Sequence, residues 1–287
     1  SGCGFIGAHL VDRLRAAGHS VLAPRRAEAD LTDPARLRGL CDGVEVVINL
    51  AGALGRWQTP RAQLDAVNVQ GAVSLAREAQ RAGVRHFVHV SGGGVSGPGP
   101  RAGLISEDTP CHPESDYEAS KLAGERALLA EAERGLPLTL ARATFTYGPG
   151  DRHKLPLYRA IARRRFFWVD GGMGRLHPLF VGDLVEGLLL AARAEPRARI
   201  YLLGGPRPLT AREVGQTIAA ALGVAAPRLS LPAALLAPVV ALAEPLGRAL
   251  GVEPPLTRSR LSQWRDHHAY DIRRARAELG YAPRVDF

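Results

Sequence analysis

The sequence predicts an α/β protein: a Rossmann-type doubly wound parallel sheet with a smaller C-terminal substrate domain. Short apolar runs rich in β-branched residues alternate with helical patterns, which is typical of βαβ units and a parallel sheet. The glycines Gly4 and Gly7 open the first helical pattern, as the second half of a nucleotide-binding glycine loop does. With 287 residues, the chain is long enough for one large domain or two modest ones.

Five strands and six helices are expected along the chain. The strands are expected at 20–23, 44–50, 84–90, 138–143 and 200–203. The helices are expected at 5–17, 34–41, 63–82, 115–134, 180–194 and 210–222. Thr210 and Glu213 form a capping box for the last of these helices. The strand that should precede the glycine loop is missing, so we expect a fragment or a trimmed gene product whose first sheet strand is absent.

Two domains follow from this order of elements. We expect residues 1–165 to bind a dinucleotide, with 176–205 returning to that domain, and 166–287 to bind mainly the substrate. The long apolar segment 229–250 is interrupted by three prolines and Glu244, too often for an integral membrane span. A helical lid or a membrane-surface patch is expected there.

Composition narrows the function classes. The net charge is +9, but the arginines are spread along the chain without a nucleic-acid-binding motif, so no nucleic-acid partner is expected. Cys3, Cys41 and Cys111 are odd in number and widely spaced, which argues against a disulfide framework. The histidines His86 and His89 lack the partners of a metal site, and none is expected. These features predict a cytoplasmic protein.

The most informative motif is Tyr117 followed four residues later by Lys121. The chain has 37 basic residues, and all but two are arginine. Four residues on a helix place both side chains on one face, where an ammonium group favours the phenolate. Tyr117 is therefore a candidate proton donor or acceptor, and the alternative is a solvent-facing pair without a role.

A cofactor site is predicted from two further patterns. Gly4, Phe5, Ile6 and Gly7 would bring backbone N–H groups to a pyrophosphate, with Ser1 where the first glycine of the motif belongs. About twenty residues later, Arg25 and Arg26 stand where an acidic residue would bind the ribose of NAD, which favours the 2′-phosphate of NADP. Asp30 and Leu31 would lie along the edge of the adenine ring. Solvated arginines without a role are the alternative.

These motifs and their order resemble the extended short-chain dehydrogenase/reductase family, also called the NAD-dependent epimerase/dehydratase family. The likeness runs through nearly the whole chain. Its matching segments are 4–7, 30–33, 49–52, 68–71, 117–121, Arg142 with 147–150, and 180–183. The C-terminal segments 254–257, 270–272 and 275–283 are most similar to the branch with 3β-hydroxysteroid dehydrogenase-like and dihydroflavonol reductase-like members.

The resemblance implies roles for several residues. Leu50, Ala51 and Gly52 would line NADP or NAD, and Asn68 would brace the site. Lys121 would bind the nicotinamide ribose and lower the pKa of Tyr117, which would move a proton as hydride passes between cofactor and substrate. A homodimer formed through the helices that start near Gln63 and Ser115 is also implied.

One position departs from the family pattern. The family has Ser or Thr five residues before the glycine that matches Gly97, and this chain has Gly92. That hydroxyl would donate to the substrate oxygen, so catalysis is expected to be slowed or lost unless Ser91 or Ser96 substitutes. Ser91 is the third catalytic candidate.

Three functions are consistent with these patterns. The first is an oxidoreductase that interconverts a secondary alcohol and a ketone of a small molecule with NADP or NAD. The second is a nucleotide-sugar epimerase or dehydratase that uses the same Tyr117 and Lys121. The third is a structural or regulatory protein that binds NADP without turnover, for which Gly92 is the main support.

Overall fold

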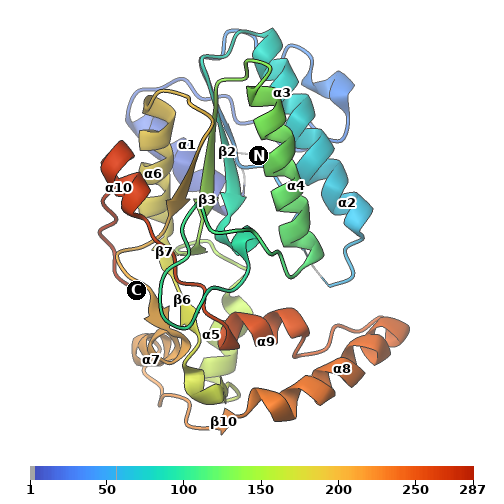
Figure 1. Cartoon of the computed structure of the whole chain (residues 1–287), viewed down its shortest axis with the longest axis vertical. Helices are drawn as coiled ribbons and strands as arrows, with labels where there is room; N and C mark the ends of the chain where they lie inside the picture. The colour runs from blue at the N-terminus through green and yellow to red at the C-terminus, as the bar shows by residue number, and fades with distance from the viewer. Residues whose placement is uncertain (1–3, 56) are drawn as a thin grey trace.

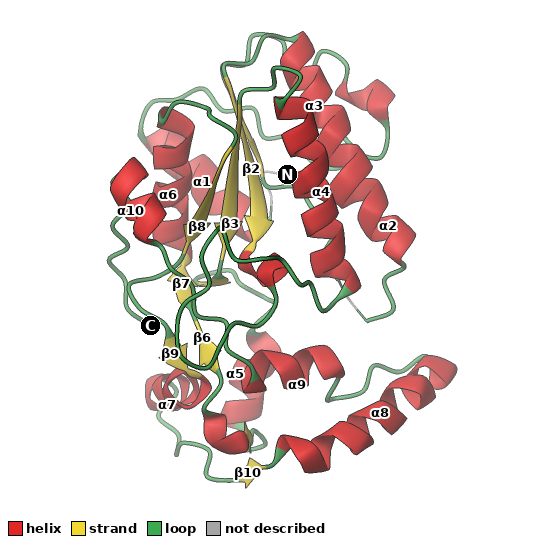
Figure 2. Cartoon of the chain, viewed as in Figure 1, coloured by secondary structure: helices red, strands yellow, loops and turns green. Residues whose placement is uncertain are grey.

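The computed structural model describes residues 4–55 and 57–287 and is built around a four-stranded parallel sheet (Figures 1 and 2). The strand order is β1 (Val46–Asn49), β2 (His86–Gly92), β3 (Leu138–Ala143) and β8 (Arg199–Leu203). All three neighbouring pairs are parallel. The carboxyl ends of the strands therefore meet at one edge, where ligands bind in open α/β sheets.

Helices cover both faces of this sheet, as Figure 1 shows. One face carries α2 (Arg61–Asp65), the π-helical turn η2 (Ala66–Gly71), α3 (Ala72–Arg81) and α4 (Asp116–Ala132). The other carries α1 (Phe5–Ala16), α6 (Val181–Arg193) and α10 (Arg273–Leu279). Separate apolar cores lie under the two helical layers. The predicted doubly wound α/β fold is confirmed.

The first predicted strand is wrong. Residues 20–23 have no regular secondary structure, and β1 is the edge strand of the described sheet. A strand is stabilised by hydrogen bonds to a neighbour, and among residues 4–55 and 57–287 no strand lies beside this segment. The helix predicted at 34–41 is also shorter, because only the 3₁₀ turn η1 (Pro34–Leu37) forms there.

The helix predicted at 63–82 starts earlier and is not uniform. It runs from Arg61 to Arg81 as α2, the π-helical η2 and α3. A π turn inserts an extra residue into a helix and is often found at functional sites. Here the turn contains Asn68, so the irregularity falls on a predicted site residue.

The remaining elements form the lower part of the molecule in Figure 1, apart from the 3₁₀ turn η3 (Gly93–Ser96), which follows β2. Two-stranded pairs join β4 (Phe145–Tyr147) to β7 (Pro178–Phe180), β6 (Arg175–Leu176) to β9 (Leu209–Thr210), and β5 (Trp168–Val169) to β10 (Ser230–Leu231). The other elements are α5 (Leu155–Ala162), η4 (Asp170–Gly172), α7 (Ala211–Ala221), α8 (Ala233–Leu250) and α9 (Arg258–Arg265). The predicted capping box of Thr210 and Glu213 starts α7.

Trp168 belongs to the core of this part. Its side chain is buried, its ring lies edge-on to Phe166, and its indole N–H donates to the Pro227 carbonyl oxygen. Trp168 is thus a packing residue.

The helix α8 accounts for most of the apolar segment 229–250. It holds Pro238 and Pro245 in its interior, and it is long and apolar enough to cross a membrane by length and composition alone. Most of its side chains are exposed rather than packed inside the protein. The helix continues through both prolines, although each of them lacks a backbone N–H.

Candidate active site

The Tyr117 and Lys121 side chains project from the first two turns of α4. The helix starts at a fixed residue because Ser115 and Glu118 form a capping box: the Ser115 hydroxyl accepts from the Glu118 N–H, and the Glu118 carboxylate accepts from the Ser115 N–H. The capping box thereby sets where α4 begins, and with it the positions of Tyr117 and Lys121 beside the sheet edge.

Lys121 lies between the ends of two neighbouring strands. Its Nζ donates a 2.8 Å hydrogen bond to the Val90 carbonyl oxygen in β2. A Cβ added to Gly52, in the loop after β1, would lie 3.8 Å from the same Nζ. Burial lowers the pKa of Lys121 to about 8, and the nearby Glu125 carboxylate opposes this shift. The ammonium group is therefore held at the site with little solvent around it.

Tyr117 packs against the loop after β1. A Cβ on Gly55 would lie 2.6 Å from the Tyr117 Cβ, so only glycine fits at that position. Burial, with a smaller contribution from the Glu118 carboxylate, raises the pKa of Tyr117. The expected lowering by Lys121 is absent in the protein alone, because the Lys121 ammonium is turned toward the Val90 carbonyl oxygen.

Asn68 ties α4 to the loop after β1. Its amide nitrogen donates to the Ala53 carbonyl oxygen at 3.1 Å and to the Ser120 hydroxyl at 2.9 Å. Its amide oxygen accepts from the Ala53 N–H at 2.8 Å. Gly124 allows this approach, because a Cβ there would collide with the Asn68 carbonyl oxygen. The buried amide therefore joins the loop after β1 to α4, and its role in a cofactor site stays a prediction.

The predicted glycine loop lies at the start of α1. Gly4 is the residue before the first helical turn, Phe5 and Ile6 are partly buried, and Gly7 is buried. Ile6 and Leu50 pack against the same apolar core, which brings the helix start to the end of β1. Helix N–H groups in a first turn have no intrahelical acceptor and can bind an anion. Ser1 and Cys3 lie outside the described residues.

This arrangement fits a dinucleotide. The helix start, the side-chain-free surface at Gly52 and the buried Lys121 ammonium lie around the carboxyl ends of β1 and β2. The Asn49 amide oxygen accepts from the Ala51 N–H at 3.0 Å and fixes the loop that holds Leu50, Ala51 and Gly52. A Cβ on Gly52 would lie 3.2 Å from the Asn68 amide oxygen, so the loop runs close to the bracing residue.

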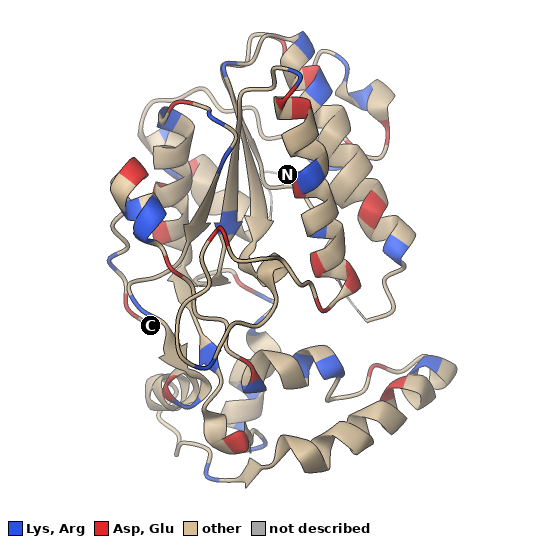
Figure 3. Cartoon of the chain, in the orientation of Figure 1, with Lys and Arg blue, Asp and Glu red and all other residues tan. Residues whose placement is uncertain are grey.

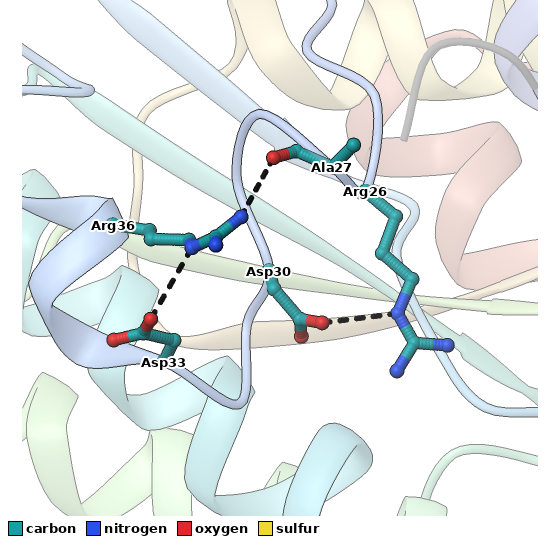
Figure 4. A pocket seen from close by; sticks show the side chains of 5 residues that line it. All are labelled: Arg26, Ala27, Asp30, Asp33 and Arg36. Atoms are coloured by element: carbon teal, nitrogen blue, oxygen red, sulfur yellow. Dashed lines mark hydrogen bonds and ion pairs between the residues drawn. The ribbon is translucent and has the colours of Figure 1, made fainter.

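The predicted adenosine end is more exposed and its charges are paired (Figure 4). Arg26 forms an ion pair with Asp30 at 3.1 Å, and Arg36 forms one with Asp33 at 3.3 Å. Hydrogen bonds from Thr32, with help from Arg26, lower the pKa of Asp30 to about 2. These residues line a cavity of about 440 Å³.

Leu31 and Arg25, the other two residues predicted at this end, differ in their contacts with the rest of the protein. Leu31 is in contact range of Gly71, where an added Cβ would lie 2.7 Å from the Leu31 Cβ. This contact joins the segment 30–33 to the helix that carries Asn68. Arg25 is exposed, and its backbone N–H donates to the Glu28 carboxylate. No hydrogen bond among the described residues links Arg25 to the Tyr117 end.

The departure at Gly92 lies at the last residue of β2. A Cβ on Gly92 would meet nothing within 4 Å, so a hydroxyl-bearing side chain fits there without repacking. The hydroxyls of Ser91 and Ser96 are buried and have no hydrogen-bond partner in the described protein. Ser91 is next to Val90, whose carbonyl oxygen holds Lys121. A buried hydroxyl without a hydrogen-bond partner is uncommon in folded proteins.

Several neighbours of the site had no role assigned to them from the sequence. The Tyr270 ring lies against Gly93, where a Cβ would be 2.8 Å from Tyr270 Cζ, and a Cβ on Gly94 would be 2.6 Å from Glu118 Oε1. Arg142 forms a buried 2.7 Å ion pair with Glu125, one turn beyond Lys121. The spacing of Lys121 and Glu125 on one helix face was the available signal for that pair.

His177 and Arg175, which precede β7, contact backbone groups. His177 Nε2 bonds to the Gly205 carbonyl oxygen, and its Nδ1 accepts from the Tyr270 N–H. Arg175 donates to the Gly103 carbonyl oxygen. Within the described ranges 4–55 and 57–287, no three His, Cys, Asp or Glu side chains gather as a metal site would need.

Known proteins are similar to this chain in sequence and in fold. Sterol demethylase protein B of Methylococcus capsulatus is 30% identical over 98% of this chain and 91% of its own. A ketoreductase of Stigmatella aurantiaca, named for a 4-farnesyl-3,4-dihydroquinoline-1-oxide substrate, is 29% identical over 99% and 91%. The NAD-bound structure of DesIV, a dTDP-glucose 4,6-dehydratase from Streptomyces venezuelae, superposes with a TM-score of 0.78 at 24% identity, covering 100% of this chain and 91% of DesIV.

The sequence model of the NAD dependent epimerase/dehydratase family matches residues 2–204. The match covers the glycine loop, the loop after β1, Asn68 and the Tyr117 to Lys121 segment. The relatives named for sterols support the predicted likeness to the 3β-hydroxysteroid dehydrogenase branch. The chain therefore belongs to the NAD dependent epimerase/dehydratase family, a family of NAD(P)-dependent enzymes.

Proposed function

We propose that this chain is an NAD(P)-dependent oxidoreductase that interconverts a secondary alcohol and a ketone of an apolar small molecule. The observation that carries the proposal is the placement of Tyr117 and the buried Lys121 at the carboxyl ends of β1 and β2. A nicotinamide cofactor would supply the hydride, and the protein positions the substrate and moves a proton.

Tyr117 is the proton donor in this proposal. Its raised pKa keeps the phenol protonated at neutral pH. A protonated phenol can donate to the oxygen of a ketone as the carbonyl carbon is reduced. In the reverse reaction the phenolate accepts the proton of an alcohol.

Lys121, Asn68 and Ser91 have supporting roles. The Lys121 ammonium would bind the ribose hydroxyls of the cofactor, and as a positive charge it would stabilise a phenolate. Asn68 holds the loop of Gly52 and Ala53 through two hydrogen bonds to Ala53, and a third, to the Ser120 hydroxyl, joins it to α4. The unpartnered Ser91 hydroxyl would bind the substrate oxygen in place of the hydroxyl that Gly92 lacks.

The cofactor proposed is NADP rather than NAD. Arg25 and Arg26 follow the segment 20–23, and arginine can bind the 2′-phosphate through several donors. Asp30 pairs with Arg26 and competes for it, so Arg25 would carry much of the selectivity. The cavity in Figure 4 is lined by equal numbers of acidic and basic side chains, which limits the preference to a modest one.

An apolar substrate is supported by two relatives. One is named a sterol demethylase and the other a ketoreductase of a farnesylated compound, and both match nearly the whole chain. We propose that 1–165 with 176–205 binds the cofactor and that 166–287 mainly binds this substrate. Pairing of two copies through α3 and α4 is proposed as well, and light scattering tests it.

The test is nicotinamide absorbance over time, with NADP and NADPH, against hydroxysteroids, flavonoid ketones, prenylated ketones and nucleotide sugars. We expect net oxidation of NADPH by an apolar ketone, and loss of this activity in Tyr117→Phe. If no apolar ketone or alcohol changes the redox state of the cofactor, the proposal is wrong.

The second candidate is a nucleotide-sugar epimerase or dehydratase. It is favoured by the family description, and Tyr117 and Lys121 would serve it equally. Product analysis separates the two, because an epimerase changes the sugar without net change in the cofactor. Cofactor binding without any product would favour the non-catalytic alternative, for which Gly92 is the supporting residue.

A further inference from the structure

The outer face of α8 is apolar and exposed. The large side chains on this face are each at least 60% exposed: Leu235, Val239, Leu242, Leu246 and Leu250. Val252, just beyond the end of the helix, is exposed to the same extent. Figure 3 shows the ribbon of α8 without charge along most of its length. A contiguous row of this kind on a folded protein marks an interaction surface rather than ordinary surface variation.

The opposite face of α8 packs on the protein. Leu236 and Val240 are buried in a core with Val169 and Leu261. The one acidic residue of the helix, Glu244, also points inward and accepts from the Arg258 N–H at 2.8 Å. The helix thus has two apolar faces, one used for folding and one exposed. The exposed face carries no acidic side chain.

Basic residues flank the start of this face. Arg164 and Arg165, which follow α5, line a cavity together with Arg228 and Leu229. Arg228 and Leu229 come directly before β10, which leads into α8. Arg163 is exposed beside them, and Leu229 is 58% exposed. An apolar row next to a group of arginines is complementary to a bilayer with anionic lipids, where acyl chains meet negative headgroups.

We propose that the outer face of α8, together with Arg163, Arg164, Arg165 and Arg228, docks on the surface of a membrane that contains anionic phospholipid. The helix lies in the interface and does not cross the bilayer. Its inner face is fixed to the core, and both of its ends return to the same part of the fold through β10 and α9. An interfacial helix of this kind binds through one apolar face.

Docking would bring the active site close to the bilayer. The end of α8 reaches the loop after β1, where the Arg248 guanidinium lies 5.9 Å from the centre of the Trp57 ring. Gly55 of the same loop packs on Tyr117. An apolar substrate dissolved in the membrane would therefore have a short path to the phenol. The docking inference itself does not depend on the proposed redox function.

Vesicle flotation tests the inference directly with the whole chain. Vesicles of phosphatidylcholine alone are compared with vesicles that contain about 30% phosphatidylglycerol, at low and high salt. We expect binding to the anionic vesicles, weakened by salt. The double variant Leu242→Gln/Leu246→Gln should bind at least about tenfold more weakly, because it removes the centre of the apolar row.

Matched variants separate the surface from general effects. Leu22→Gln/Leu104→Gln changes two exposed leucines elsewhere and should bind as the wild type does. Arg165→Gln/Arg228→Gln should lose the preference for anionic vesicles, whereas Arg15→Gln/Arg38→Gln, with the same loss of charge, should keep it. Circular dichroism shows that each variant is folded.

Three results would overturn the inference. The first is absence of binding to any vesicle by the folded wild type, and the second is equal binding by the α8 variant. The third is a dimer, seen by light scattering, that the α8 changes dissociate, because it would assign this face to a second copy. All three readouts are independent of turnover, so failure of the proposed function leaves them interpretable.

Discussion

The two ends of the proposed cofactor site differ in how their side chains are held. At the Tyr117 end, Asn68 and Lys121 are buried and bonded to backbone groups of the loops after β1 and β2. At the adenosine end, Arg25 and Arg26 are exposed, and Arg26 forms an ion pair with Asp30. The first end is fixed by packing and hydrogen bonds, and the second by charge.

This difference assigns turnover to the Tyr117 end of the site and the choice between NADP and NAD to the adenosine end. A change to a buried, hydrogen-bonded group costs stability where it leaves the partner unsatisfied. Exposed ion pairs contribute little to stability and are screened by salt. We therefore expect mutations at the Tyr117 end to affect turnover and folding strongly, and mutations at the arginine end to shift cofactor preference mildly.

The largest expected effect is that of Tyr117→Phe. Loss of the hydroxyl should lower the turnover rate by about a hundredfold to ten-thousandfold, as for other general acids. Affinity for NADPH, measured by fluorescence titration, should change only a few-fold. Tyr158→Phe, on α5, is the control and should retain activity. Equal rates in wild type and Tyr117→Phe would remove the phenol from the mechanism.

The second prediction concerns pH and Lys121. Its pKa is lowered from 10.5 to about 8 in the folded chain, so the unfolded chain binds an extra proton between these values. The free energy of unfolding should therefore rise with pH in this window, by up to about 3 kcal/mol for this group. The cost of burying the ammonium is fully present below pH 8 and is relieved above it.

Denaturant titrations of the cofactor-free chain at several pH values measure this slope. Lys121→Met removes the titrating group and should flatten the profile between pH 8 and 10. A wild type whose stability falls throughout this window, with the same slope in Lys121→Met, would mean that Lys121 is solvated.

Gly92→Ser tests the end of β2, where the family's side-chain hydroxyl is missing. The added side chain has open space, and we expect it to raise the rate of ketone reduction about tenfold or more by donating to the substrate oxygen. Gly93→Ser is the steric contrast, because its Cβ would lie 2.8 Å from the Tyr270 ring and should lower the melting temperature. A slower Gly92→Ser enzyme that is still fully folded would show that the glycine is required.

The smallest effect is expected at the adenosine end. Arg25→Gln should weaken NADPH binding about threefold to tenfold relative to NADH, and added salt should reduce the difference. Arg38→Gln removes a nearby charge and serves as the control. An unchanged ratio of the two dissociation constants would leave Arg25 as a solvated surface residue.

Much of the frame was predictable from the sequence. The strands 138–143 and 200–203 coincide with β3 and β8 to within one residue, because continuous apolar runs between helices are buried on both faces. Tyr117 and Lys121 were predictable as a pair, because the helical repeat fixes their shared face. The capping box at Thr210 also follows from local spacing, and it is present.

Other features depend on contacts between distant residues. The segment 20–23 has a strand-like composition but no neighbouring strand in the described part of the chain, so local pattern alone predicts it wrongly. The π turn at Asn68 fits against Gly124, more than fifty residues away, and no periodicity reveals it. The raised pKa of Tyr117 depends on burial and on the direction of Lys121, which spacing does not define.

The open space at Gly92 also has an evolutionary consequence. In the genetic code, two of the four glycine codons become serine codons through a single nucleotide substitution. Since the surrounding packing already accommodates a Cβ, no compensating change elsewhere in the protein is needed. Where the gene uses one of these two codons at this position, the hydroxyl-bearing and hydroxyl-free forms of this enzyme are one nucleotide substitution apart.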